Sequence, residues 1–240
     1  MLFGILNCCR YAKPKAPLTS SLFTSTRTMS TGNKPSKSAQ AQAAASSNPE
    51  PSFSSLGIRN STINEAPGVQ LSPHQKLVVG SVLDLFEGNP TLKHFSLWSP
   101  DAVFEDPITS AAGEAKYKAQ WYGLPALFSP ITLQSHTVVD AGNPVRLETS
   151  NKYVVRGIGS AHTISSVVNI HLGDDGKIAK VQDRWNDKLP EGVIMNTFRK
   201  INAVTVPMLI TVPKTEEEDM KMQAARDKEM QAAKEKEETK

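Results

Sequence analysis

The stretch Leu-Trp-Ser-Pro-Asp-Ala-Val-Phe-Glu-Asp-Pro, at residues 97–107, is the pattern on which the fold prediction rests. Ser-Pro-Asp is typical of a turn, and the apolar residues after it predict an extended run from Ala102 to Ile108. Two adjacent acidic residues, Glu105 and Asp106, lie in that run. One strand does not define a fold, so its meaning depends on the elements before and after it.

Helical patterns lie on both sides of this strand. A capping box of Ser72 and Gln75 predicts the start of a helix whose apolar residues repeat at helical spacing as far as Phe86. Further helices are predicted at residues 92–98 and 111–124, and the proline that follows the last one should end or kink it.

Beyond residue 130 the pattern changes to strands. Apolar and polar residues predict strands at 131–139, 145–157, 161–172 and 177–185. Gly-Asp-Asp-Gly between the last two is a strong hairpin signal. Three helices followed by an antiparallel meander predict an α+β domain over residues 71–213, with its helices on one side of the sheet.

The segment before this domain is basic and rich in hydroxyl groups. Residues 1–40 contain no acidic residue, which is typical of a mitochondrial transit peptide. The alternative is a disordered tail without a targeting role. A start at Met29 would remove most of the basic residues and predicts a cytosolic form.

Two other segments have biased composition. Residues 41–70 contain few large apolar groups and predict a disordered linker. Residues 214–240 are rich in Glu, Lys, Ala, Met and Gln and predict a charged helical tail. A solvated helix is favoured there over a partner-binding one because the methionines form no sustained heptad seam.

Charge and cysteine content exclude several classes of function. Six of the 27 Lys and Arg residues lie in the first 49 positions, which leaves 21 against 24 acidic residues, a net charge of −3. Phosphate contacts need a basic surplus, so no nucleic-acid partner is predicted. The only cysteines, Cys8 and Cys9, precede the domain, and no metal or other cofactor is predicted. The late apolar run at 203–212 is too short to be a transmembrane segment.

The motif at residues 97–107 resembles a signature of the nuclear transport factor 2-like superfamily, which has alternating acidic and apolar residues before an aspartate and a proline. Residues 175–186 resemble the superfamily's final strand. More narrowly, residues 181–192 and 202–213 resemble an uncharacterised eukaryotic branch of SnoaL-like proteins. The resemblance implies a cone-shaped fold in which three N-terminal helices pack on a curved, mostly antiparallel sheet around a pocket.

The ketosteroid isomerases of this superfamily offer a mechanism to test by position. Counting from the shared motifs, Asp106 falls on the general base and Trp185 on a pocket tryptophan. The two oxyanion donors fall on Val82 and Val168. Because such donors supply much of the rate, we expect no isomerase of that design.

Strand alternation then predicts which side chains face the pocket. The predicted lining comprises Asp106, Trp98, Trp121, His162, Ile164, Ser166, Val168, Val181, Asp183 and Trp185. A largely apolar concavity with a few polar groups is typical of a small-molecule site.

Three of these residues are candidate catalytic groups. Asp106 is either a base with a raised pKa or a turn residue that accepts backbone hydrogen bonds. His162 and Asp183 form either a base with its orienting acid or a structural polar pair, and the structural role is favoured. His162 and His171 should face opposite sides of a strand, which argues against a shared metal.

Three functions remain open at this point. The favoured one is a pocket that binds an unknown apolar or mixed small molecule with little or no catalysis. The second is a lyase, hydratase or cyclase with Asp106 or His162 as its acid/base. The third is a protein-interaction module. The opposite face of the sheet is polar enough for solvent or for a homodimer interface, and carries Thr163, Ser165, Asn169, Gln182 and Arg184.

Overall fold

The computed structural model describes residues 50–186 and 210–238. The predicted leader, and the segments at 187–209 and 239–240, lie outside them. The helices are α2 (Phe53–Leu56), α3 (Pro73–Phe86), the 3-10 helix η1 (His94–Leu97), α4 (Glu114–Leu127) and α6 (Glu216–Glu238). The strands are β1 (Trp98–Glu105), β2 (Ser110–Ala112), β3 (Phe128–Asp140), β4 (Val145–Val155), β5 (Ala161–Leu172) and β6 (Ile178–Trp185).

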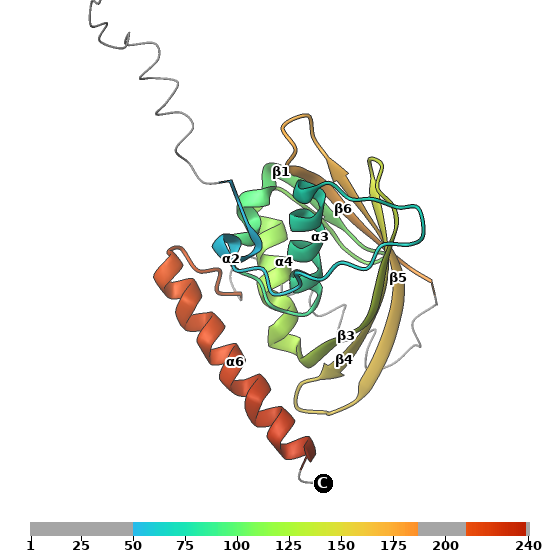
Figure 1. Cartoon of the computed structure of the whole chain (residues 1–240). Coiled ribbons are helices and arrows are strands. Elements are labelled where there is room, and N and C mark those ends of the chain that lie inside the picture. Colours follow the sequence, from blue (N-terminus) through green and yellow to red (C-terminus); the bar gives the residue numbers. More distant parts are fainter. Residues whose placement is uncertain (1–49, 187–209, 239–240) are drawn as a thin grey trace, which may run out of the picture. The chain divides into compact units, whose positions relative to one another are not determined.

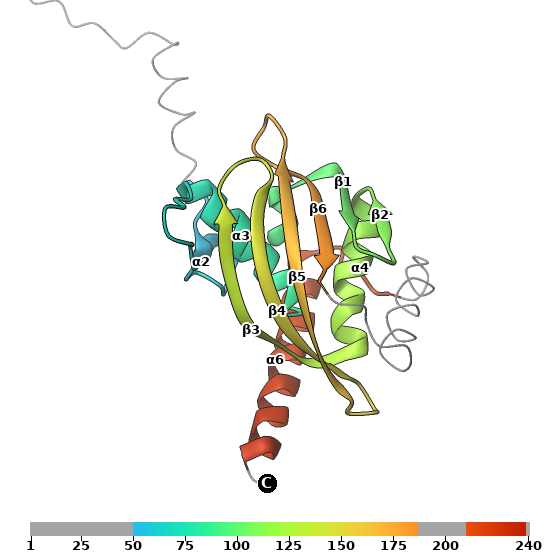
Figure 2. The same ribbon diagram turned by 90° about the vertical axis from the view of Figure 1, so that its right-hand side faces the viewer.

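The strands form one curved sheet in the order β2-β1-β6-β5-β4-β3 (Figures 1 and 2). Only β1 and β6 are parallel neighbours, and all other pairs are antiparallel. Helices α3 and α4 lie on one face of this sheet. The predicted α+β class, with helices on one side of a mostly antiparallel sheet, is confirmed.

The element bounds differ from the predictions near the chain's first strand. Strand β1 begins at Trp98, which the sequence placed in a helix, and Ser110–Ala112 pairs with β1 instead of starting the next helix. Helix α4 also passes through Pro125, since it ends only at Leu127. A proline in the last turn removes one backbone donor, and the Phe128 amide still reaches the Leu124 carbonyl.

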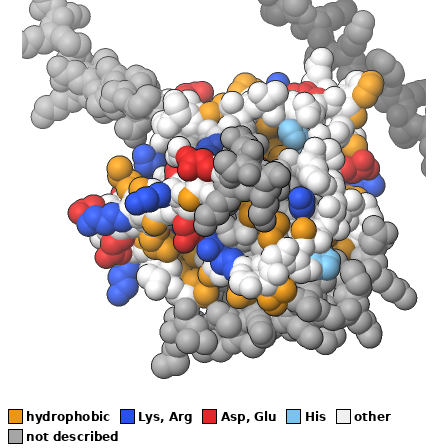
Figure 3. Space-filling model, turned by 90° about the horizontal axis from the view of Figure 1, so that it is seen from below, with side chains coloured by type: hydrophobic (Ala, Val, Ile, Leu, Met, Phe, Trp, Pro, Cys, Tyr) orange, Lys and Arg blue, Asp and Glu red, His pale blue; other side chains and the backbone are white. Residues whose placement is uncertain are grey.

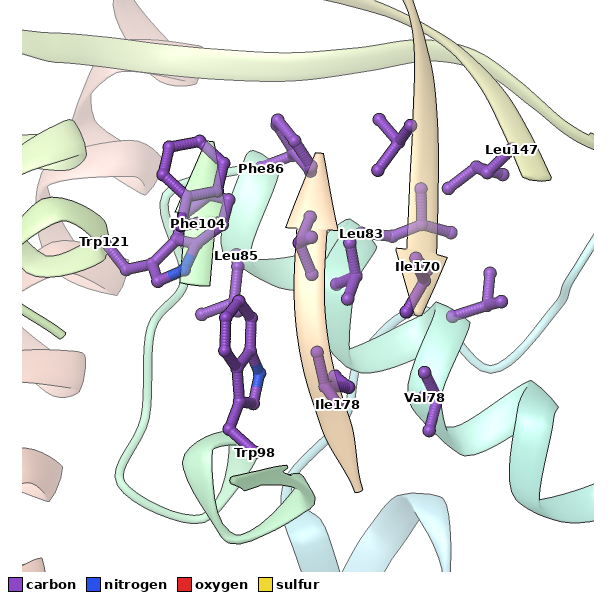
Figure 4. Close-up of a cluster of buried hydrophobic side chains, with 14 of the residues drawn as sticks. Val78, Leu83, Leu85, Phe86, Trp98, Phe104, Trp121, Leu147, Ile170 and Ile178 are labelled. Atoms are coloured by element: carbon purple, nitrogen blue, oxygen red, sulfur yellow. The ribbon is translucent and has the colours of Figure 1, made fainter. Parts of the chain in front are cut away.

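The core lies between the helical layer and the sheet. Helix α3 is buried from Leu77 to Phe86, so it fills the interior on all sides. Figure 4 shows its apolar side chains meeting Ile170 and Ile178 from the sheet and Trp98 and Trp121 from the other side. Burial of this continuous apolar surface is what holds helices and sheet together.

Residues 50–70 do not form the disordered linker that their composition suggested. Buried Asp84 of α3 accepts hydrogen bonds from the backbone amides of Arg59 and Asn60, at 2.8 and 3.0 Å, and from the Asn60 side chain at 2.6 Å. Ile58 is buried beside them, and Glu65 pairs with β3. A few specific contacts thus order a segment of low apolar content, and the linker prediction was wrong for residues 50–70.

This packing predicts an unusual response at Gly80. A Cβ added there would lie 2.4 Å from the Asn60 carbonyl oxygen, which belongs to the backbone and cannot easily move. Gly80→Ala should therefore destabilise the protein by about 1 to 2 kcal/mol, although alanine favours helices by up to about 1 kcal/mol. Urea unfolding measures the change.

The same substitution in α4 serves as the control. A Cβ on Gly123 meets only the Ile210 side chain, at 3.4 Å, which is an ordinary contact. Gly123→Ala should leave stability unchanged or raise it by up to about 1 kcal/mol. Equal effects at Gly80 and Gly123 would mean that residues 58–60 do not pack on α3 as described.

The charged tail forms helix α6, but it is not solvated all round. Asp219 is buried and accepts hydrogen bonds from the Tyr122 hydroxyl at 2.7 Å and the Leu92 amide at 2.6 Å. Ion pairs join Asp227 to Arg59 and Glu229 to Arg156. The solvated-helix interpretation is therefore corrected: one side of α6 docks on the domain, and the partner of this helix is its own chain.

The surface and helices also bear on the predicted partners. No helix in the described parts of the chain is long and apolar enough to span a membrane. Viewed from below, basic, acidic and hydrophobic side chains are interspersed over the described surface (Figure 3). This face thus offers no continuous basic patch of the kind that phosphate backbones require.

Candidate functional site

A small cavity lies between the helices and the sheet. Its lining comes from α3, α4 and strands β1, β4, β5 and β6, and comprises Phe86, Phe104, Asp106, Gln120, Trp121, Leu124, Tyr153, Ile164, Asp183 and Trp185. The cavity volume is about 30 Å³, room for about two water molecules.

Aromatic rings form one wall of the cavity. The Trp121 ring lies 4.6 Å from the Phe104 ring and 5.1 Å from the Phe86 ring, centroid to centroid. The three rings converge from α4, β1 and α3 (Figure 4). Such packing makes the wall rigid and apolar, so a polar group that faces it is poorly solvated.

Asp183 is the most perturbed carboxyl group at this site. It is 7% exposed, and its Oδ2 accepts a hydrogen bond from Trp185 Nε1 at 2.8 Å. Burial raises the pKa of Asp183 to about 7, the charge of Asp106 adds to the increase, and the Ser166 hydroxyl and the Trp185 indole oppose it. Asp183 can therefore hold a proton at a pH where an ordinary aspartate is ionised.

Asp106 takes part in a turn and also lines the cavity. Its Oδ1 accepts the Ile108 amide at 2.8 Å in the turn after β1. Burial raises its pKa, while the hydrogen bonds from Ile108 and Thr109 act in the opposite direction. Two acidic groups therefore meet at one enclosed space.

Three buried polar atoms of the lining have no hydrogen-bond partner among the described residues. They are Asp183 Oδ1, Gln120 Oε1 and Trp121 Nε1. An unpaired buried polar group costs about 1 to 3 kcal/mol, so three of them beside one cavity indicate a place for a polar molecule. Trp121 Nε1 is a donor and Gln120 Oε1 is an acceptor. The Asp183 carboxyl group accepts when it is ionised and can donate when it is protonated.

The structure brings together half of the predicted site residues. Asp106, Trp121, Ile164, Asp183 and Trp185 line the cavity. The other pocket predictions are not in the lining: Trp98, Val168 and Val181 are buried core residues, and Ser166 pairs with Thr149 at 3.1 Å. Strand alternation correctly predicted which side chains face inward. It could not predict which of them line the cavity, because packed side chains fill the interior at other positions along the strands.

His162 lies apart from Asp183. In the sheet Asp183 is opposite Val168, six residues along β5 from His162, a separation of about 20 Å. The His162 ring instead forms a hydrogen bond of 2.7 Å with the Ser160 hydroxyl. The base-and-orienter pair of His162 and Asp183 is not formed, so His162 is no longer a candidate acid/base at this cavity.

Sequence reasoning missed five lining residues, namely Phe86, Phe104, Gln120, Leu124 and Tyr153. A signal for two of them existed. Gln120 and Leu124 are one helical turn apart and share a face with Trp121, so the polar Gln120 on an apolar face was informative. Tyr153 required the register, which places it opposite His162.

A metal site finds no support in these side chains. Within residues 50–186 and 210–238, no group of three or more His, Cys, Asp or Glu residues is placed to hold a metal ion.

Comparison with known proteins gives the cavity a family context. Residues 85–181 match the model of the SnoaL-like domain. No protein with a curated description matches the sequence. Similar solved structures include a nuclear transport factor 2-like protein of unknown function from an Exiguobacterium species, at 19% identity over 46% of this chain and 99% of that one, with a TM-score of 0.39.

Two further structures have names that suggest enzymes. A putative polyketide cyclase from a Silicibacter species is 14% identical over 50% of this chain and 93% of its own, with a TM-score of 0.42. A putative isomerase from Bacillus subtilis is 21% identical over 48% and 90%, with a TM-score of 0.39. These identities are too low to transfer an activity.

The fold and the site together define a class of protein. It is an α+β domain whose helices close one side of a curved sheet over a cavity lined by aromatic and acidic side chains. Residues 85–181 match the SnoaL-like domain, which agrees with the resemblance that the motif at residues 97–107 carries.

Proposed function

We propose that the cavity binds a compact small molecule and that Asp183 and Asp106 transfer protons to and from it. One observation carries the proposal: two carboxyl groups, the more buried with a pKa near 7, line the same aromatic cavity. General acids and bases work best when their pKa lies near the working pH. A pocket that only binds an apolar ligand has no use for two buried acids.

The lining specifies the chemistry of the ligand. Trp121 Nε1 requires a hydrogen-bond acceptor, such as a carbonyl oxygen, and Gln120 Oε1 requires a donor. The aromatic wall favours an apolar remainder. Because the cavity is small, a ligand of more than a few atoms requires a side chain to move, and partly exposed Trp185 at the end of β6 is the candidate.

The proposed step is enolisation of a carbonyl compound. Asp183 donates its proton to the carbonyl oxygen, Asp106 accepts a proton from the adjacent carbon, and the electron pair of that C–H bond forms the C=C bond of the enol. Asp183 is directly opposite Val168 in the sheet. Asp183 therefore lies on the strand next to Val168, the position at which the ketosteroid isomerases have an oxyanion donor. Val82 and Val168 argue against a ketosteroid-isomerase design, but not against a reaction in which Asp183 donates the proton.

The test uses acetone as a probe, because it is one of the smallest carbonyl compounds that can enolise. In heavy water, enolisation replaces the methyl protons of acetone with deuterium, which proton NMR follows directly. We expect exchange above the buffer rate, and a loss on the order of 10²-fold in Asp183→Asn and in Asp106→Asn. Asp174→Asn, at an exposed turn, is the matched control and should exchange like the wild type.

A second measurement separates binding from catalysis. Acetone that enters the cavity should shift the indole N–H signal of Trp121 in nitrogen-15 NMR spectra. Signal shifts without exchange would refute proton transfer and leave a ligand-binding pocket. Equal exchange rates for the wild type and both cavity variants would also refute the catalytic proposal.

A further inference from the structure

A second, larger hollow lies on the outer face of the sheet. Its volume is about 540 Å³, and it is lined by Pro144, Arg146, Val167, Asn169, His171, Gln182, Arg184, Trp185 and Asn186. The strand residues between these, such as Leu147, Val168 and Val181, point into the core. The hollow, which we call the outer groove, is therefore on the sheet face opposite the helices, the face turned toward the viewer in Figure 2.

The outer groove is cationic. Arg146 and Arg184 line it, and neither forms an ion pair with another described residue. Arg184 Nε donates to Gln182 Oε1 at 2.9 Å, which leaves the terminal nitrogens of its guanidinium available. The lining contains no acidic side chain. Two arginines thus face one hollow, and neither is held by an ion pair to a carboxylate of the described residues.

Three acids flank the groove on the same sheet face, and among the described residues none of them forms an ion pair with Arg146 or Arg184. Glu148 lies two residues from Arg146 on β4, opposite Val167. Glu105, beside Gln182, forms an ion pair with Lys180 at 2.5 Å. Asp140 is opposite Arg146 in the register, but its Oδ1 accepts the Gly142 amide at 2.8 Å. The pKa of His171 is lowered by burial and by the charges of Lys180 and Arg184, which agrees with a positive potential in the groove.

Neutral donors lie between the arginines. Arg146, Asn169 and Gln182 are cross-strand neighbours on β4, β5 and β6, so their side chains stand in one row. A planar guanidinium binds a carboxylate or phosphate through two parallel hydrogen bonds. An amide N–H₂ of Asn169 beside it can complete the contact with such an anion.

We propose that the outer groove binds a small organic anion through a carboxylate or phosphate group held by Arg146 and Arg184. The groove volume suits a small molecule. A second copy of the chain fits less well, because a two-fold contact centred here would bring the two arginines against their own copies. The groove shares Trp185 with the cavity, but both arginines line the groove alone, so anion binding does not depend on the proton-transfer proposal.

Inorganic phosphate is the first probe and acetate the second, each titrated into nitrogen-15-labelled full-length protein at constant ionic strength. Saturable shifts should appear at Asn169, His171 and Arg184. Arg146→Gln and Arg184→Gln should each weaken binding roughly tenfold or more, since each removes charged hydrogen bonds. A preference for phosphate or for acetate identifies which of the two anion groups is bound.

Arg156→Gln is the matched control, because Arg156 pairs with Glu229 away from the groove. It should bind phosphate within about twofold of the wild type. Unsaturable shifts, or equal weakening in all arginine variants, would show non-specific screening and overturn the proposal. Shifts that follow protein concentration instead of phosphate would overturn it in favour of self-association.

Discussion

The wild-type protein should lose about 3 kcal/mol of stability relative to the Asp183→Asn variant when the pH rises from 4.5 to 8. The folded-state pKa of Asp183 is near 7 because the side chain is buried, whereas the unfolded chain has the ordinary value of about 3.9. Between these values the folded protein keeps a proton that the unfolded chain releases. Stability from this group is therefore complete below about pH 4 and lost as the pH rises to about 7.

Urea unfolding of both proteins at several pH values measures this difference. Asparagine cannot ionise, but its side-chain oxygen can still accept the Trp185 indole hydrogen bond, so the variant should fold. Asp174→Asn, at an exposed turn, should follow the wild-type pH dependence. Parallel stability curves for the wild type and Asp183→Asn would show that Asp183 titrates normally and would remove the acid from the proposed mechanism.

Replacing Asp219 with alanine should destabilise the protein by about 3 kcal/mol. The carboxylate accepts hydrogen bonds from the Tyr122 hydroxyl, in buried surroundings, and from the Leu92 amide, in part-buried surroundings. Burial and the bond to Asp219 raise the pKa of Tyr122. Alanine leaves both donors unpaired; the buried hydroxyl costs about 1 to 3 kcal/mol and the part-buried amide adds a smaller cost.

Thermal unfolding and hydrogen exchange of α6 together measure this effect. Glu217→Ala is the control on the same helix: Glu217 pairs with Lys221 at 2.8 Å, but both side chains are largely exposed, so the loss should be below about 0.5 kcal/mol. Asp219→Asn retains one acceptor oxygen and should fall between the two. If Asp219→Ala and Glu217→Ala behave alike, α6 does not dock through Asp219.

Docking of α6 has a consequence for the cavity. Tyr122 is on α4, next to Trp121 and near Gln120, both of which line the cavity. Asp219 thus holds the outer side of the helix whose inner side forms the aromatic wall. We expect Asp219→Ala to broaden the Trp121 indole signal as well as to lower stability.

Most of the fold could be predicted from the sequence because its signals are local. The capping box at Ser72 and Gln75 is formed in the structure, and β5 begins and ends at the predicted residues. Helical spacing and strand alternation depend only on backbone geometry and on which side chains avoid water. The error at Trp98 arose where pairing with the distant strand β6 overrode the local pattern, and the error at residues 110–112 arose where this segment pairs back on the preceding strand β1.

The site was less predictable because it depends on packing. Alternation placed Asp183 and Val168 on the inner face, but only the filled volume around them shows that one lines a cavity and the other is core. His162 has the same alternation and lies too far along β5. Register and side-chain volume, which no single segment encodes, separate these cases.

By itself the sequence determined the α+β class, the order of helices and strands, the family motif and the presence of Asp106 at the end of the first strand. Only the tertiary structure determined that Asp106 meets Asp183, that residues 58–60 pack on α3, and that the charged tail docks through Asp219. The physical reason is desolvation. A carboxyl group acquires a raised pKa, or becomes an anchor for buried donors, only when residues distant in the chain exclude water from it.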